Sequence, residues 1–279
     1  MSLSVTLAVL LAALLHASWN AMIKGGRDVL LETALIVAGA GIVMLPLLAL
    51  VPLPAPASWP FLFASLVSHV AYYALMVSAY RSGDLSLVYP LMRGAAPLLT
   101  AVFGVLWLAE TPATTGWIGI ALISCGVAAL AARGLDHAPS RAAIGFALSN
   151  AVVIAAYTVI DGTGARRSGN PWSYIAWLFV LDAIPFTLWM LATRRQQYLT
   201  ALANAPARTL AGGGLSASAY AISVWAMTQA PVALVASLRE TSVLFAALIG
   251  ARMLKEKLGA RRWLAAAAIV AGAVFLKVG

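Results

Sequence analysis

The sequence is short of the residues from which soluble enzymes and secreted domains are built. It has one cysteine, Cys125, so neither an intrachain disulfide nor a cluster of thiolate metal ligands can form. Only 10% of the residues are charged, against about 25% in soluble domains, and only three are histidine. No HExxH pair, serine–histidine–aspartate set or phosphate-binding glycine loop occurs. The sequence therefore predicts a protein that is not an enzyme and that holds no metal or other cofactor.

What the chain has in excess is apolar surface and basic charge. Of its 279 residues 62% are hydrophobic, and the mean hydropathy is +0.93, so lipid must cover much of the surface. The net charge is +9, but the basic residues are scattered between apolar runs, with no nucleic-acid-reading motif beside them. Basic loop residues instead set the orientation of a membrane protein. We expect a lipid bilayer as partner and no nucleic acid.

Ten apolar runs follow one another along the chain. Each has about 20 residues, which is enough to span a bilayer as a helix and too long for a barrel strand. The first run lacks a preceding basic segment and is followed by others, so we interpret it as a membrane helix and not as a cleaved leader. The longest loops, after Thr193 and at 134–140, leave no room for a soluble domain. The predicted spans are residues 3–23, 29–51, 59–80, 85–108, 113–133, 141–161, 171–192, 206–227, 231–254 and 259–278.

The second half of the sequence repeats the first. A shift of 146 positions aligns five pairs without a gap: Arg93 with Arg239, Gly104 with Gly250, Glu110 with Glu256, Trp117 with Trp263, and Gly126 with Gly272. Chance matches of arginine, glutamate and tryptophan are rare in so apolar a chain. The pattern indicates two five-helix repeats, residues 1–135 and 141–279, that form one unit. Because five is odd, the second repeat enters the membrane from the opposite side, and a binding site is expected between such inverted repeats.

The basic residues outside the helices predict the orientation. Of the 18 lysines and arginines, Arg93 and Arg239 lie within helices, three lie on one side of the predicted bilayer and thirteen on the other. The positive-inside rule places the side with thirteen in the cytoplasm, so both termini are predicted outside. The thirteen are Lys24, Arg27, Arg81, Arg133, Arg141, Arg194, Arg195, Arg208, Arg252, Lys255, Lys257, Arg261 and Arg262.

Two arginines within the apolar runs are the most informative residues. A charge near the bilayer centre costs at least about 2.5–3.5 kcal/mol, so Arg93 and Arg239 must face protein, substrate or a water-filled cavity. Tyr89 lies on the face of Arg93, and Pro90 and Pro97, on either side of Arg93, kink the helix. The candidate partners of Arg93 are Asp182, Glu240 and a substrate carboxylate. Arg239 has Glu240 or a neighbouring helix as candidates, and for both arginines an ion pair and a substrate contact are open.

Further polar residues recur at helical spacing. His69, Tyr73, Met76 and Tyr80 share one face of the third run, with Tyr72 at its edge, and this face either lines a cavity or packs on a neighbour. Asp182 either is an embedded group that binds a proton or caps a helix pair. Glu110 and Glu256 end their helices, where capping of the next helix or a bond across the turn is the favoured interpretation. The candidate substrate-binding residues are Trp19, Asn20, His69, Tyr72, Tyr73, Tyr89, Arg93, Tyr157, Arg239 and Glu240.

Three segments carry a resemblance to a known family. VLWLAE at 105–110 and RMLKE at 252–256, each before a glycine- and alanine-rich helix, and HASWNAMIK at 16–24 resemble the EamA-type transporters of the drug/metabolite superfamily. The resemblance implies ten helices in inverted repeats around a central cavity, exporting small metabolites, often amino acids, by alternating access. In the YddG-like amino-acid exporter branch, an aromatic, histidine-containing cavity would suit His69, Tyr72, Tyr73 and Tyr89.

These observations predict an all-α integral membrane protein of ten transmembrane helices. Its expected function is secondary export of a small metabolite, amino acids by preference, across the bacterial inner membrane. A lipid-linked metabolite flippase and an integral-membrane enzyme are the alternatives. The sequence leaves the coupling ion and the oligomeric state open, and a monomer is compatible with it.

Overall fold

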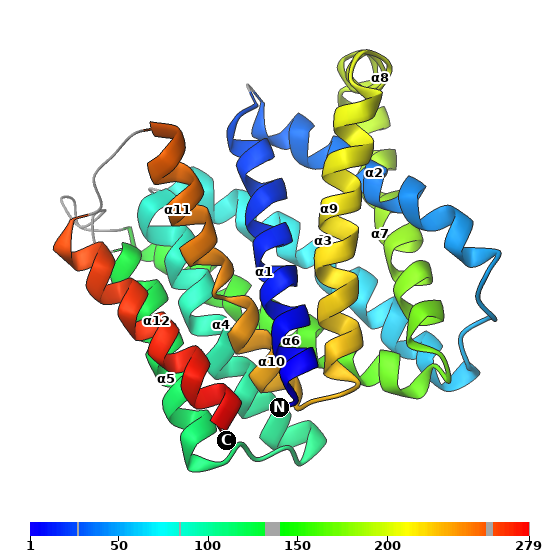
Figure 1. The fold of residues 1–279 in the computed structure, drawn as a ribbon. Coiled ribbons are helices and arrows are strands. Elements are labelled where there is room, and N and C mark those ends of the chain that lie inside the picture. Colours follow the sequence, from blue (N-terminus) through cyan, green and yellow to red (C-terminus); the bar gives the residue numbers. More distant parts are fainter. Residues whose placement is uncertain (27, 84, 132–139, 255–258, 279) are drawn as a thin grey trace.

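The computed structural model describes residues 1–26, 28–83, 85–131, 140–254 and 259–278, and these form helices joined by short connections (Figure 1). The first half contains α1 (Leu3–Lys24), α2 (Val29–Leu48), the short 3-10 helix η1 (Pro56–Ser58), α3 (Trp59–Ser82), α4 (Leu85–Leu108) and α5 (Thr114–Ala131). The second half contains α6 (Arg141–Arg167), α7 (Pro171–Thr193), α8 (Arg195–Asn204), α9 (Pro206–Met227), α10 (Val232–Arg239), α11 (Ser242–Leu254) and α12 (Ala260–Val278).

Seven of the described helices are long and apolar enough to cross a membrane: α1, α2, α3, α4, α6, α7, and α10 with α11 taken as one span. Their outward faces carry large apolar side chains, such as Leu7, Val67 and Leu106, which are 57–69% exposed. Exposed apolar faces of this kind are typical of surfaces that contact a membrane or another protein. The other three predicted spans correspond to α5, α9 and α12, which are not among these seven, so a membrane count of ten stays a prediction.

Local sequence explains where several helices begin. Asp28 accepts hydrogen bonds from the amides of Leu30 and Leu31, and Ser140 accepts one from Ala143 at 3.0 Å. Such caps satisfy backbone donors that have no partner within the helix. A proline occupies the first position of α7 and of α9, where its missing N–H costs nothing.

The stretch 231–254, which was predicted as one continuous span, forms two helices. α10 ends at Arg239 and α11 starts at Ser242. Around the break, the amides of Glu240 and Thr241 bond to carbonyls three residues back instead of four, and the Thr241 hydroxyl donates to the Leu238 carbonyl at 2.7 Å. The break therefore arises without a proline, through tighter turns that a hydroxyl side chain supports.

The stretch after Thr193, which was predicted as a loop, contains α8. Most of this short helix is exposed, but Tyr198 is buried and packs in a cluster with Leu35 and Met190. Its hydroxyl lies 3.3 Å from the Thr187 hydroxyl. Tyr198, with Ala201 and Leu202 packed beside it, therefore holds a mostly exposed helix against the end of the bundle (Figure 1).

Packing between the halves is reciprocal. α3 packs on α6 as α9 packs on α1, and α2 packs on α9 as α7 packs on α3. α4 packs on α6 as α11 packs on α1, and α2 with α7, α4 with α10, and α5 with α12 pair directly. Exchange of the two halves converts each contact into another of the set, as a two-fold relation requires.

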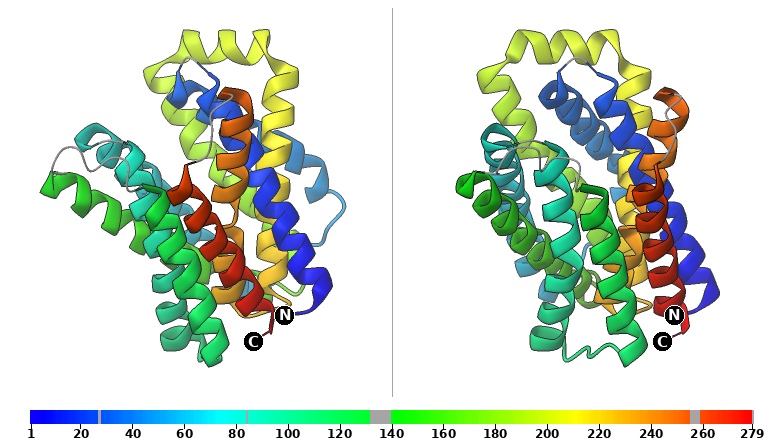
Figure 2. Two further views of the ribbon diagram at one scale, coloured as in Figure 1. Left: turned by 60° about the vertical axis from the view of Figure 1, so that its left-hand side comes forward. Right: turned by 90° about the vertical axis from the view of Figure 1, so that its left-hand side faces the viewer.

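The α5–α12 pair shows this reciprocity atom by atom. A Cβ on Gly126 would lie 2.9 Å from the Ala265 carbonyl oxygen and 2.6 Å from Ile269. A Cβ on Gly272 would lie 2.7 Å from the Gly119 carbonyl oxygen and 2.7 Å from Ile123. Each contact maps onto the other by the 146-residue shift. The two helices lie side by side and run in opposite directions (Figure 2), and glycine gives their backbones room to approach.

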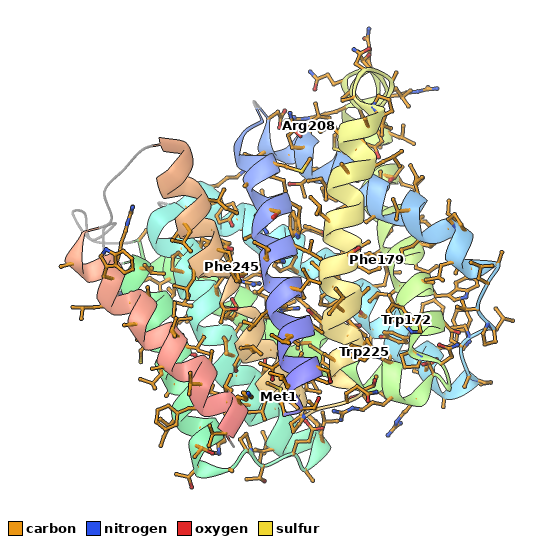
Figure 3. All side chains as sticks on the ribbon, viewed as in Figure 1. Met1, Trp172, Phe179, Arg208, Trp225 and Phe245 are labelled. Atoms are coloured by element: carbon orange, nitrogen blue, oxygen red, sulfur yellow. The ribbon has the colours of Figure 1, made fainter. Side chains whose placement is uncertain are left out.

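The ends of the bundle are distinct. Both termini lie at one end, and α8 lies at the other (Figures 1 and 2). Figure 3 shows Met1 at the end with the termini and Arg208 at the end with α8. At the α8 end, Arg194 pairs with Asp28 at 2.7 Å and Arg208 with Glu32 at 3.2 Å, so ion pairs join the two halves there.

Candidate functional site

The two intramembrane arginines converge on one glutamate. Arg93 lies in α4 between Pro90 and Pro97, and its Nε is 2.9 Å from Oε2 of Glu240, the C-cap residue of α10. The two side chains are only 7% and 2% exposed. Of the three candidate partners of Arg93, the structure selects Glu240. We call Arg93, Arg239 and Glu240 the arginine cluster.

Arg239 has a different environment from Arg93. It is buried, and its guanidinium carbon lies 5.4 Å from the centre of the Tyr220 ring. Its Nε has no hydrogen-bond partner, and the described residues offer it no carboxylate in an ion pair. A cation on an aromatic face gains about 2 kcal/mol when desolvated, which is less than a buried guanidinium loses with its water. Among the described residues, Arg239 is therefore the cation of the cluster with no carboxylate within ion-pair distance, although Glu240 lies within its electrostatic reach.

Aromatic side chains from three other positions surround the arginine cluster. Tyr89 and Tyr157 lie within electrostatic reach of both arginines and of Glu240, and His16 lies within reach of both arginines. Tyr157 is buried, whereas His16 and Tyr89 keep intermediate exposure. Hydroxyl and imidazole groups therefore lie close to the arginine cluster.

A second polar group lies beside the first, and we call His69, Asp161 and Asp182 the carboxylate cluster. Asp161 of α6 is fully buried and accepts hydrogen bonds from the hydroxyls of Tyr174 at 2.9 Å and Tyr220 at 2.6 Å. His69 Nδ1 of α3 is 3.9 Å from Asp182 Oδ1 of α7. Asp182, a candidate partner of Arg93, is therefore the neighbour of His69.

Two tyrosines connect the clusters. The Tyr157 ring stacks on His69 with centroids 4.5 Å apart and lies near both arginines. Tyr220 donates to Asp161 through its hydroxyl and supports Arg239 with its ring. The connected site draws on α3, α4, α6, α7, α9 and the break between α10 and α11, so it lies where both halves meet.

The other predicted site residues are distributed unevenly. Tyr72 contacts Tyr157, with centroids 6.1 Å apart, and so joins the site. Tyr73 stacks on Phe186 of α7 at 5.0 Å. Trp19 packs edge-on against His16, and the side-chain amide of Asn20 donates to the His16 backbone carbonyl at 2.8 Å. Both residues therefore make local contacts within α1.

Glu110 caps a helix, but not the next one in the chain. It accepts a hydrogen bond from the Val232 amide at 2.8 Å, at the start of α10, and pairs with Arg166 of α6. Arg166 also donates to the carbonyls of Met227 at 2.8 Å and Ala230 at 3.0 Å. The contacts of Glu110 with Arg166 and with the Val232 amide join the two halves at the end opposite α8. Glu256 lies outside the described residues.

Sequence reasoning did not include Asp161, Tyr174 and Tyr220 in the site. Asp161 was visible as an ionisable residue within an apolar run, and such a group requires hydrogen-bond donors. Tyr174 and Tyr220 are 13 and 59 residues away from it, so only the fold shows that they are those donors. Among the described residues, no group of three or more histidine, cysteine, aspartate or glutamate side chains is placed to hold a metal ion.

Comparison with known proteins assigns the fold. One solved structure, described only as the crystal structure of a protein, superposes with a TM-score of 0.76 at 19% identity over 100% of this chain and 98% of the other. No curated protein sequence matches. The model of the EamA-like transporter family matches twice, at residues 3–132 and 141–278. With two EamA repeats that together cover nearly its whole length, the chain belongs to the EamA-like transporter family.

Proposed function

We propose that this protein exports small metabolites, amino acids by preference, as a secondary transporter that works by alternating access. The observation that carries the proposal is Arg239, a buried guanidinium at a break in a membrane helix, which has no carboxylate of the described residues within ion-pair distance. Broken helices mark the substrate site of many transporters, because their ends present unpaired backbone groups and charges near the bilayer centre.

The carboxylate of a substrate would complete the arginine cluster. Glu240 already lies against Arg93 at 2.9 Å, which leaves Arg239 to receive a second anion. A charge-assisted hydrogen bond between guanidinium and carboxylate contributes about 1.5–3 kcal/mol. Arg239 would exchange its contact with the Tyr220 ring for this bond, so binding is favourable without the cost of breaking the Arg93 pair.

The aromatic residues suit the rest of an amino acid. The His69 and Tyr72 rings contact Tyr157 of α6, Tyr89 lies within electrostatic reach of Arg239 and Glu240, and all three side chains keep intermediate exposure. Side chains that line a water-filled space have this combination, and we propose that they line the central cavity. Their rings could pack on a substrate side chain, as the YddG-like amino-acid exporter branch would imply.

The reciprocal packing supports inverted repeats, which we propose as the basis of alternation. α5 and α12 run in opposite directions with equivalent contacts, as a two-fold axis in the membrane plane requires. Ion pairs join the halves at both ends: Glu110 with Arg166 at one, Asp28 with Arg194 at the other. Opening one end while the other stays closed would expose the same site to each side in turn. We place the α8 end in the cytoplasm of a bacterial inner membrane.

Counterflow in proteoliposomes tests the proposal. Vesicles loaded with unlabelled amino acid should accumulate the labelled one when they carry wild-type protein. Arg239→Gln should lower apparent affinity about tenfold or more, the equivalent of the lost bond. The control, Arg195→Gln, changes an exposed arginine at the start of α8 and should exchange like wild type. Absence of exchange for every amino acid, or exchange of a lipid-linked metabolite alone, would overturn the proposal.

A further inference from the structure

Asp182 is an acid of the site with no hydrogen-bond donor from the described part of the chain. It lies near the middle of α7, and its side chain is 16% exposed. Its neighbour His69 is 3.9 Å away, which is beyond hydrogen-bond distance. The His69 Nδ1–H donates instead to the Ser65 carbonyl at 3.0 Å, since a carbonyl oxygen can only accept. A carboxylate in the middle of a membrane helix requires a partner, so Asp182 is open to one from outside the chain.

Asp161, the other acid of the carboxylate cluster, is already saturated. It is fully buried, and the hydroxyls of Tyr174 and Tyr220 donate to its two oxygens at 2.9 and 2.6 Å. Such bonds stabilise the ionised carboxylate without neutralising its charge. The cluster therefore contains two acids, of which Asp182 is the one with room for an incoming cation.

The charge of the site matches a substrate that has one cation more than a zwitterion. With the acids ionised and the histidines neutral, the arginine cluster carries one net positive charge and the carboxylate cluster two negative ones. The carboxylate of an amino acid balances the first cluster, but its α-ammonium group balances only half of the second. An uncompensated charge is unfavourable in a low-dielectric interior, and a second cationic group on the substrate removes it.

The arrangement of the groups places this second cation far from the substrate carboxylate. Arg239 lies over the Tyr220 ring, and the Tyr220 hydroxyl reaches Asp161. The same ring contacts His69 edge-on, with centroids 6.3 Å apart, and Asp182 is the neighbour of His69. Within electrostatic reach of Asp182 are His69 and Asp161, but neither arginine. A cation at the end of a long side chain can reach Asp182 while the α-carboxylate is bound at Arg239.

We infer that the preferred substrates are dibasic amino acids, such as lysine, ornithine and arginine, whose side-chain cation pairs with Asp182. The inference rests on the proposed function and names its substrate class. The α-carboxylate would bind Arg239, and the side chain would extend past two tyrosine rings. Tyr157 lies within electrostatic reach of Arg239, and Tyr73 within that of Asp182. Aromatic rings suit such a side chain, because they pack on its methylene groups and attract its cation.

A set of matched substrates tests the inference in proteoliposomes. Lysine should exchange in counterflow, and norleucine, which has the lysine side chain without its ammonium group, should compete at least about tenfold more weakly. Exchange of norleucine as good as that of lysine would overturn the inference and leave the proposed function intact. So would equally good exchange of cadaverine, a diamine without a carboxylate for Arg239. Absence of exchange for every amino acid would instead overturn the proposed function.

Variants of Asp182 then locate the cation. Asp182→Asn should lower the apparent affinity for lysine about tenfold or more and change that for norleucine less than about twofold. Asp182→Glu is the matched control, because it keeps the charge and should keep the preference for lysine. Norleucine exchange shows at the same time that each variant is folded. Equal losses for lysine and norleucine in Asp182→Asn, or an unchanged preference for lysine, would overturn the assignment.

Discussion

Replacing either Arg93 or Glu240 alone should reduce the stability of the protein, because the two residues form a buried ion pair. Both are buried, and removing one partner of a buried pair leaves an isolated charge, which typically costs about 3–5 kcal/mol. We predict that Glu240→Gln lowers the thermal unfolding midpoint of the protein in detergent. The double variant Arg93→Gln/Glu240→Gln should recover part of this loss, because it removes both charges.

The matched control for this pair is at the surface. Asp28→Asn removes one charge from the pair with Arg194, whose side chains are 40–42% exposed, and asparagine can still cap α2. A loss of no more than about 1 kcal/mol is expected there. Equal losses from Glu240→Gln and Asp28→Asn would show that burial does not matter to the first pair.

For individual residues, the sequence predicts which side chains are unusual in a membrane helix but not which side chains they contact. The insertion cost of Arg93 and Arg239 follows from their position in apolar runs, and that is a local property. The choice of Glu240 over Asp182 as the partner of Arg93 depends on how α4 lies against the break after α10. It is therefore a property of the fold, and neither residue spacing nor periodicity contains it.

Between elements, close approach of α5 and α12 depends on glycine. Gly272→Ala should destabilise the protein by about 1–3 kcal/mol, because its Cβ would lie 2.7 Å from the Gly119 carbonyl oxygen. Gly145→Ala in α6 has nothing within 4 Å and should instead stabilise by about 0.5–1 kcal/mol. Unfolding midpoints of the two variants on the same side of the wild-type value would contradict this packing.

At the end opposite α8, Arg166 holds α6 to the start of α10. Arg166→Gln should cost about 1–3 kcal/mol, since the guanidinium donates to two carbonyls and to Glu110. Its neighbour Arg167 lies over the Phe61 ring at 5.1 Å, so Arg167→Gln should cost less. Chemical unfolding of both variants distinguishes them, and a larger loss for Arg167→Gln would contradict the role given to Arg166.

The helices themselves could largely be predicted, because apolar runs of spanning length leave the backbone little alternative. Two elements could not. α8 is mostly exposed, and its position depends on the buried Tyr198. The break at Glu240 and Thr241 contains no proline from which it could be predicted. A tertiary contact stabilises α8, whereas the break depends on tighter local turns and on the Thr241 hydroxyl.

For the whole molecule, the distribution of basic residues predicts the orientation. The α8 end should lie in the cytoplasm and both termini outside, because the loops at that end carry most of the lysines and arginines. Alkaline phosphatase fused after Gly279 should be active, and a green fluorescent protein at the same site should be dark. The reverse pattern would show that the molecule is inserted the other way.

The 146-residue shift already indicated two repeats, and the family model matches both of them. What sequence alone lacked was the way the halves share their helices. Reciprocal packing places Arg93 of one half against Glu240 of the other, so the site exists only between them. A motion of one half against the other must therefore change access to it.

Accessibility of the helix break tests this account most directly. In a Cys125→Ser background, a cysteine at Thr241, which is 3% exposed here, would report on the space beside Arg239. A membrane-impermeant thiol reagent should modify it from either face, in whole cells and in inverted vesicles, and a transported amino acid should protect it. Modification from one face only, or from neither, would contradict alternating access to this site.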